Sequence, residues 1–172
     1  MKAKLSVAIL ALAGLAAAAD EPVVRAALQP SNERKPAPEF ALKDASGKTV
    51  KLRNYRGKVV LLDFWATWCH GCKEEIPWFS EFQKKYGKKG FAVVGVSLDD
   101  DGWKALRPFL AGTNVGYRMV LGDPDTARKY GAADALPDTF LIDQKGRVAA
   151  AYNGLVDKDD VEANIKSTLA KR

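Results

Sequence analysis

Residues 59–72 read VVLLDFWATWCHGC, and this stretch decides the fold. The first seven residues are apolar or favour strands, apart from one acid at Asp63, and such a run predicts a strand buried on both faces. A short turn then leads to a Cys-His-Gly-Cys sequence at residues 69–72. Apolar residues follow at helical spacing, namely Ile76, Phe79, Phe82 and Tyr86. The sequence therefore predicts two cysteines at the point where a buried strand gives way to a helix.

The position of the two cysteines has chemical consequences. The first turn of a helix has unpaired amide N–H groups and the positive end of the helix dipole, so a thiolate at Cys69 would be stabilised there. Cys69 is therefore the predicted nucleophile. Cys72 lies one turn later, close enough to form a disulfide with Cys69, and we expect it to be less accessible, as suits a resolving thiol.

A structural disulfide and a metal site are the alternatives for this cysteine pair. Closing so short a loop removes little entropy from the unfolded chain, so a purely structural disulfide would stabilise the fold little. Two thiolates and His70 make an incomplete zinc set, and Lys73 after Cys72 does not indicate haem attachment. The acids at 99–101 are explained more simply by helix capping than by a cation. We expect redox chemistry and no metal.

These residues resemble the thioredoxin superfamily, and within it the exported TlpA/ResA-like thiol-disulfide oxidoreductases. The resemblance covers roughly residues 38–170 and rests on WATWCHGC at 65–72 together with LPDTF at 136–140. Further matches lie in short motifs, namely APEF at 37–40, GKVV at 57–60, IP at 76–77 and LID at 141–143. The motifs are specific jointly rather than singly. The resemblance implies an enzyme that exchanges disulfides with other proteins and needs no nucleotide or metal cofactor.

Sequence patterns predict the order of the elements. A hairpin is expected at 40–51, a second buried strand at 91–97, a helix capped by the acids at 99–101, and a strand at 117–121. A short helix from Asp123 to Gly131, a hairpin over 138–152 and a helix from Asp157 complete the order. By resemblance, this is an α/β thioredoxin-like fold. Its mixed central sheet is flanked by helices, with an N-terminal β-hairpin and an inserted helix and strand.

Length and composition indicate one domain. The chain has 172 residues, 47% of them hydrophobic, which is enough for one core. We place the domain at residues 38–172 and predict a flexible tether at 20–37, which is polar and without a sustained period. The net charge of +6 comes from 27 basic and 21 acidic residues that are intermixed, with no basic cluster of the kind that binds nucleic acid. No heptad pattern is present, and we expect a monomer.

Residues 1–19 have the pattern of a secretory signal peptide. Lys2 and Lys4 precede an apolar stretch from Leu5 to Ala19, with small residues at the expected cleavage point after Ala19. An uncleaved membrane anchor is the alternative, although the apolar run is shorter than the ~20 residues of a spanning helix. An exported protein whose two cysteines form one C-x-x-C places its thiol chemistry in an oxidising compartment, and we expect a periplasmic location.

Asp63 and Glu75 are the predicted acid–base residues. A carboxylate in the middle of a buried strand is costly unless it is paired, hydrogen-bonded or protonated. Asp63 matches the buried aspartate of thioredoxin, which helps to move the proton of the resolving cysteine. Glu75 matches a glutamate that many TlpA-like proteins use instead, three residues after the second cysteine. This chain has both, although an exposed helix glutamate would be ordinary.

His70 is the only histidine of the chain and lies next to Cys69. A cation or hydrogen-bond donor there would stabilise the thiolate and make the couple more oxidising. The alternative is an exposed residue with modest influence, and the sequence leaves both open. Both intervening residues, His70 and Gly71, depart from the family pattern, so the redox potential is open as well.

The predicted substrate-binding residues are Trp68, His70, Leu136 and Pro137. By resemblance, Pro137 has a cis peptide bond and faces the disulfide, where the lack of an N–H lets the neighbouring backbone take up a partner peptide. Trp68, directly before Cys69, is a candidate groove wall, whereas Trp65 looks like core.

The leading hypothesis is an exported reductase of protein disulfides. Cys69 attacks the substrate disulfide, and Cys72, deprotonated with help from Asp63, resolves the mixed disulfide. The resemblance suggests cytochrome c maturation as one role and a membrane thiol transporter of the DsbD or CcdA kind as electron donor.

Other functions are kept as alternatives. A thiol peroxidase shares this fold, but Thr67-Trp68-Cys69 lacks the Thr-x-x-Cys spacing of such enzymes. A disulfide oxidase or isomerase would use the same cysteines at a higher reduction potential. A binding or chaperone module with an inert disulfide is the remaining alternative.

Overall fold

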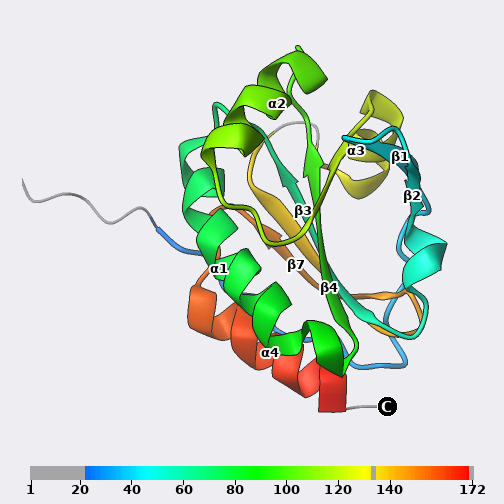
Figure 1. Ribbon diagram of the computed structural model, residues 1–172. Helices are drawn as coiled ribbons and strands as arrows, with labels where there is room; N and C mark the ends of the chain where they lie inside the picture. The colour runs from blue at the N-terminus through cyan, green and yellow to red at the C-terminus, as the bar shows by residue number, and fades with distance from the viewer. Residues whose placement is uncertain (1–21, 133–134, 171–172) are drawn as a thin grey trace, which may run out of the picture.

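The computed structural model describes residues 22–132 and 135–170, so the predicted signal peptide at residues 1–19 lies outside them. No helix within the described residues is long and apolar enough to cross a membrane. Figure 1 shows the elements in chain order, which are β1 Ala41–Asp44, β2 Thr49–Lys51, η1 Leu52–Tyr55, β3 Val59–Trp65, α1 His70–Tyr86, η2 Gly87–Lys89, β4 Phe91–Ser97, α2 Trp103–Gly112, β5 Arg118–Leu121, α3 Pro124–Tyr130, β6 Asp138–Ile142, β7 Val148–Asn153 and α4 Lys158–Ala170.

One mixed sheet of seven strands organises the molecule, in the order β2-β1-β5-β4-β3-β6-β7. The strand β3, predicted from its apolar run, lies inside the sheet and is buried at every residue. It pairs in parallel with β4 and antiparallel with β6. The predicted N-terminal hairpin is formed by β1 and β2. The predicted mixed sheet with flanking helices is therefore confirmed.

Helices cover the two faces of the sheet unequally. On one face, the odd-numbered residues of β3 pack with α1, α4 and α2 (Figure 1). On the other face, its even-numbered residues pack with the β1–β2 hairpin and with Tyr130 of α3. Asp63 is one of the odd-numbered residues of β3 and therefore lies on the face covered by α1.

The inserted helix and strand join the hairpin to the rest of the sheet. The strand β5 pairs in parallel with β4 and antiparallel with β1, so it lies between the hairpin and the central strands. β5 is shorter than β4 and pairs only with its residues 94–97. Among the residues described, the first part of β4, residues 91–93, consequently has no strand partner on that side.

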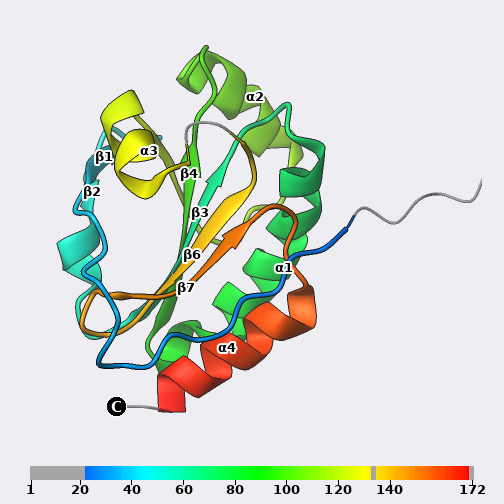
Figure 2. The ribbon, with the colours of Figure 1, turned by 180° about the vertical axis from the view of Figure 1, so that it is seen from behind.

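The segment from residue 22 to 37 differs from the predicted flexible tether. It follows the β7 edge of the sheet, with isolated bridges between Val24 and Val156 and between Pro36 and Arg147. The Gln29 N–H donates to the Ala149 carbonyl at 2.9 Å. Figure 2 shows the segment passing alongside α4. The tether prediction is wrong for these residues because backbone hydrogen bonds to a sheet edge need no periodic side-chain pattern.

The acids at 99–101 do not cap the following helix as predicted. The helix α2 begins at Trp103, and its N-cap is Gly102, which makes no side-chain capping bond. Asp99 is buried and turns back towards the active-site loop instead. A buried carboxylate that accepts several hydrogen bonds is stabilised more than one that caps an exposed helix end with a single bond.

Candidate active site around the Cys69–Cys72 pair

Cys69 and Cys72 form a disulfide at the N-terminus of α1, with their Cα atoms 5.4 Å apart. Cys69 is the N-cap residue, and its Sγ accepts a hydrogen bond from the Cys72 N–H at 3.2 Å. Cys69 is 6% exposed, whereas Cys72 is fully buried. The helix start thus offers an amide donor to Cys69 and keeps Cys72 from solvent, which fits the predicted nucleophile and resolving thiol.

Asp63 is fully buried in β3, on the face that α1 covers. Neither of its carboxylate oxygens has a hydrogen-bond partner among the residues described. Burial raises the pKa of Asp63 to about 8, and the Thr139 hydroxyl opposite it in β6 lowers this pKa in part. The two side chains nevertheless fall short of hydrogen-bonding geometry. The carboxyl is therefore poised to exchange a proton near neutral pH.

Glu75 is a second buried carboxyl, not the exposed helix residue that its sequence context would allow. It lies one turn after Cys72 on the buried face of α1, and its Oε1 accepts from the Val156 N–H at 2.9 Å. Its Oε2 finds no partner within the described residues. Burial raises the pKa of Glu75 well above its ordinary value, and the nearby charge of Asp63 raises it further.

Tyr117 is the site residue that sequence reasoning missed. Its hydroxyl is buried without a partner in the described chain, and its ring packs against the cluster that contains Cys72 and Trp65. Burial and the charges of Asp63 and Glu75 raise the pKa of this phenol well above its ordinary value. Its place two residues before Met119 puts both side chains on one face of the chain, but the sequence gives no signal of the groups that this face meets.

Gly95 and Met119 border the buried carboxyl on the other side. Asp63 is level with Gly95 in β4, and Gly95 is level with Met119 in β5. A Cβ on Gly95 would collide with the Met119 sulfur and lie 3.2 Å from Trp65 Nε1. The missing side chain at this position lets the thioether and the indole close over Gly95, next to Asp63 in the sheet.

The loop before Cys69 is fastened by Asp99. Its carboxylate accepts from the Thr67 hydroxyl at 2.6 Å and from the Ser97 hydroxyl at 2.7 Å. The Thr67 N–H also donates to it at 3.1 Å. These bonds link the loop to the end of β4 and so fix the backbone that carries Trp68 and Cys69.

The predicted substrate-binding residues gather around the start of α1. The Leu136–Pro137 peptide bond is cis, as predicted. A Cβ on Gly71 would lie 3.8 Å from Pro137 Cδ, so this proline lies against the Cys-x-x-Cys turn, and Leu136 packs against the cluster of both cysteines. Trp65 is fully buried, as predicted for a core residue, and Trp68 is 67% exposed.

His70 is exposed next to Cys69. Its Nε2 lies 3.2 Å from Glu74 Oε1, one turn further along α1. This donor is directed at a carboxylate, a geometry that favours a modest influence on Cys69. Within the described part of the chain, no group of three or more His, Cys, Asp or Glu residues could hold a metal ion.

A Cys-x-x-Cys disulfide at a helix N-terminus and a neighbouring cis-proline, both carried by a mixed sheet, are the features of thioredoxin-fold disulfide-exchange proteins. Comparison with known proteins agrees. The chain belongs to the AhpC/TSA family, which it matches over residues 34–151. Its activity is that of a thiol-disulfide oxidoreductase.

Individual relatives support this activity. The thiol-disulfide oxidoreductase ResA of Geobacillus thermodenitrificans is 32% identical over 131 residues, which cover 76% of this chain and 75% of the relative. The thioredoxin-like protein YneN of Bacillus subtilis is 32% identical over 135 residues, with 77% and 78% covered. A Chlorobium tepidum structure assigned as the thiol:disulfide interchange protein DsbE is 36% identical, with a TM-score of 0.73, over 86% of this chain and 99% of that one.

Proposed function

We propose that this oxidoreductase works as a reductant of protein disulfides outside the cytoplasm. The Cys69 thiolate attacks one sulfur of the substrate disulfide, and the other substrate sulfur leaves as a thiolate, which takes a proton from water. The Cys72 thiol then gives up its proton to a base and attacks Cys69 Sγ, which releases the second substrate sulfur as a thiolate that is protonated in the same way. Two electrons pass from the dithiol to the substrate, and Cys69 and Cys72 end as the disulfide.

The observation that carries this proposal is the pair of buried carboxyls behind the resolving cysteine. A buried thiol cannot lose its proton to bulk water, so a base inside the fold must accept it. The pKa of Asp63, about 8, is close to the ~8.5 of an ordinary thiol. We propose that Asp63, whose pKa is raised by burial, accepts this proton, and that the neighbouring Glu75 shares in holding it.

The exposed rim supports a protein substrate. Trp68 offers an exposed apolar ring beside Cys69, Pro137 lies against the Cys-x-x-Cys turn at Gly71, and Leu136 packs against the cluster of both cysteines. Proline has no N–H of its own to satisfy, so an extended substrate backbone can approach this edge. His70 completes this rim.

The cellular setting follows from the sequence. We propose that residues 1–19 direct export to the periplasm and that a membrane thiol transporter of the DsbD or CcdA kind re-reduces the disulfide. Cysteine-bearing exported proteins, such as those handled in cytochrome c maturation, would be the substrates. We propose a monomer, because the sequence has no heptad pattern.

The reduction potential of the Cys69–Cys72 couple tests the proposed direction. It is measured by equilibrating the protein without residues 1–19 in glutathione or dithiothreitol redox buffers. We expect a value below about −240 mV, near the thioredoxin end of the known range. A value above about −180 mV would instead indicate an oxidase or isomerase.

Membership of the AhpC/TSA family keeps a thiol peroxidase as a second candidate. The Thr67 hydroxyl argues against it, because it donates to Asp99 and is thereby turned away from a role in peroxide binding. Peroxide consumption by the reduced protein, compared with that of a Cys72→Ser variant, separates the two functions. A reductase is expected to consume peroxide no faster than an ordinary thiol.

A further inference from the structure

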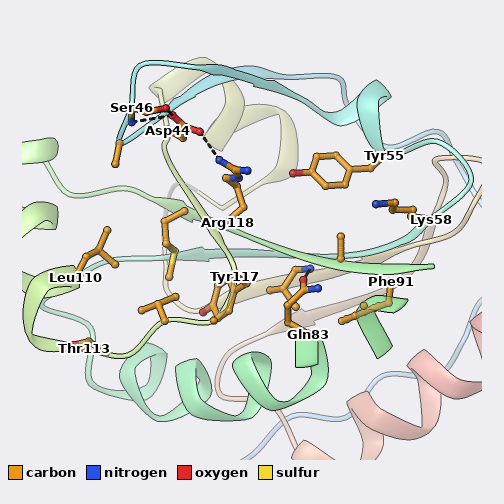
Figure 3. A pocket seen from close by; sticks show the side chains of 17 residues that line it. Asp44, Ser46, Tyr55, Lys58, Gln83, Phe91, Leu110, Thr113, Tyr117 and Arg118 are labelled. Carbon is orange, nitrogen blue, oxygen red and sulfur yellow. Dashed lines mark hydrogen bonds and ion pairs between the residues drawn. The ribbon is translucent and has the colours of Figure 1, made fainter. Parts of the chain in front are cut away.

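Two cavities border β4, one near each end of the strand. The first has a volume of about 780 Å³ and lies at residues 91–93, where β5 is too short to cover the strand. Figure 3 shows Asp44 and Arg118 on one side of it as an ion pair, with Oδ2 and Nη1 2.6 Å apart. Residues 91–93 lie beside the first half of β3, whereas the turn that leads to the disulfide follows the last residue of β3. The floor of this cavity is therefore away from the end of the sheet where a substrate is bonded to Cys69.

The second cavity has a volume of about 470 Å³ and lies at the opposite end of β4. It is lined by residues 98–100 and 102, which follow β4, by residues 121–124 at the end of β5, and by α3. We call it the carboxyl-end cavity. The strands β3, β4 and β5 run in parallel, so the turn from β3 to Cys69 lies at the same edge of the sheet. Ligands of open α/β sheets commonly bind outside the carboxyl ends of parallel strands.

Hydrogen bonds join the carboxyl-end cavity to the turn that carries Cys69. The Leu98 N–H donates to the Trp65 carbonyl at 2.8 Å. The Asp99 carboxylate accepts from the Thr67 N–H at 3.1 Å, and Thr67 is two residues before Cys69. Leu98 and Asp99 both line the cavity, so its wall is held in place next to the nucleophile. A substrate chain bonded to Cys69 extends by up to about 3.3–3.6 Å per residue, so residues a few positions from its cysteine can reach the cavity.

The lining of this cavity combines apolar walls with carboxylates. Its apolar side chains are those of Leu98, Leu121, Pro124 and Ala127. Asp100 and Asp123 also line it and are exposed, so they lie at its open side. The Asp123 Oδ1 accepts from the Thr126 N–H at 2.7 Å, which leaves its Oδ2 for another donor. The guanidinium in the lining, Arg128, has Asp125 of its own helix as a partner, with Nη2 and Oδ1 3.5 Å apart.

We propose that the carboxyl-end cavity is a subsite for a lysine or arginine side chain of the substrate protein, a few residues from the cysteine that Cys69 attacks. The apolar walls pack against the aliphatic stem, and Asp100 and Asp123 pair with the charged end. Long basic side chains commonly bury their stems in this way and keep the charge at the surface. An acidic side chain is repelled by the two carboxylates, and a wholly apolar one leaves them without a partner. The inference rests on the proposed function, because it concerns the substrate of the same dithiol.

Peptides with one cysteine linked to 2-nitro-5-thiobenzoate test this subsite. When Cys69 of the reduced protein attacks the peptide sulfur, the peptide becomes bonded to Cys69 and the coloured thiolate is displaced, so absorbance gives the rate. In a blocked peptide of alanine and glycine, one lysine is moved through the four positions on either side of the cysteine. Each peptide is compared with one that has norleucine at the same position, which keeps the stem without the charge. We expect lysine at one or two positions to react about fivefold faster than norleucine, as for an exposed ion pair.

Matched variants of the protein show whether the preference arises in the cavity. A double variant, Asp100→Asn with Asp123→Asn, removes both charges, and asparagine keeps the cap of α3. We expect this protein to react with lysine and norleucine peptides at equal rates. Asp101→Asn is the control, because Asp101 is exposed and adjacent to Asp100 but does not line the cavity. It is expected to keep the preference for lysine. Thermal unfolding of the oxidised forms checks that the variants fold.

The outcomes separate the subsite from the proposed function. A lysine preference that depends on position, is lost in the double variant and is kept in Asp101→Asn supports the subsite. An equal preference at every position, or an equal loss in Asp101→Asn, overturns it, because the effect would then belong to the general charge of the surface. A preference that survives in the double variant overturns it as well. Equal rates with lysine and norleucine in the wild-type protein overturn the subsite and leave the proposed function intact, whereas failure to react with any of the peptides overturns both.

Discussion

Among single residues, Asp63 places a carboxyl where a carboxyl is unfavourable. Asp63 is fully buried and no described residue satisfies either oxygen, so its ionised form is strongly disfavoured. The burial destabilises the fold, and it raises the pKa of Asp63 to about 8, as the proposed proton acceptor requires. Stability is therefore expected to depend on pH through this residue.

We predict that Asp63→Asn stabilises the oxidised protein more at pH 9 than at pH 5. The pKa of Asp63 is 3.8 in the unfolded chain and about 8 in the native state. At pH values between these two, Asp63 is protonated in the native protein and ionised in the unfolded chain. Wild-type stability therefore falls as pH rises through this window, by on the order of 5 kcal/mol over its full width. Urea unfolding at both pH values measures this. An equal gain from the substitution at pH 5 and pH 9 would contradict the raised pKa.

A second residue-scale prediction concerns Asp99. Asp99→Ala removes the acceptor of the Thr67 N–H and of two hydroxyls, so we expect a loss of about 2–3 kcal/mol of unfolding free energy. Asp100→Ala is the matched control, since Asp100 is exposed and its loss should change stability by less than about 0.5 kcal/mol. Urea unfolding of both variants decides this. Equal effects would show that the network around Asp99 does not fasten the loop.

The individual site residues could be predicted to different extents. Cys69, Cys72 and Asp63 stand in one continuous run, so a local pattern was enough to place them. Glu75 was identified by its spacing from Cys72, but its burial depends on Val156, far away in the chain. Tyr117 could not be found in this way, because a strand pattern gives the face of a side chain and not the groups that it meets across the sheet.

At the scale of elements, the glycine at the start of α1 and the glycine in the middle of β4 differ in the space available for a side chain. Gly71 lies in the first turn of α1, where added atoms would meet Leu155 and Pro137 at ordinary contact distance. Gly95 lies in the sheet interior, where the same atoms would collide with Met119. The sequence shows two glycines next to predicted buried segments, but only the packing separates their roles.

We therefore predict that Gly71→Ala stabilises the protein by about 0.5–1 kcal/mol, because alanine lowers the entropy of the unfolded chain and suits the helix. Gly95→Ala is the matched control and should destabilise it by about 1–3 kcal/mol through overpacking against the thioether. Thermal and urea unfolding of the oxidised forms measure both changes. The interpretation is wrong if the two substitutions change stability in the same direction.

Predictions of elements succeeded where the hydrophobic period is strong. β3, β4 and the β6–β7 hairpin agree with the expected ranges because buried strands leave unbroken apolar runs. The capping role of the acids at 99–101 failed, since a cap signal in sequence looks the same whether the carboxylate faces its own helix or a neighbouring loop. The Asp99 carboxylate faces the loop because three hydrogen-bond donors converge there.

At the scale of the whole molecule, the segment from residue 22 to 37 completes the domain. It covers the β7 edge, which would otherwise expose unpaired backbone groups. Within it, Arg34 Nη1 lies 3.2 Å from Asp143 Oδ2, and both side chains are 3% exposed. Asp143 is also held by Arg147 at 2.8 Å, so the ion pair joins the segment to the β6–β7 turn. The residues that make these contacts follow no regular spacing along the sequence, which explains why the segment was predicted to be a tether.

The final prediction follows from this edge. A chain that begins at residue 38 is compared with a matched chain that begins at residue 22. The shorter chain lacks the backbone hydrogen bonds from Val24, Gln29 and Ala37, and it lacks Arg34, the buried partner of Asp143. Each bond contributes about 0.5–1.5 kcal/mol, offset in part by the entropy of ordering the segment, so we expect a net loss of about 2–4 kcal/mol. Urea unfolding measures this loss, and size-exclusion chromatography should show association of the shorter chain through its bare β7 edge. Equal urea midpoints and a monomeric shorter chain would mean that the segment adds nothing to the domain. A loss of stability with an unchanged Cys69–Cys72 reduction potential would show that the segment stabilises the fold without affecting the redox site.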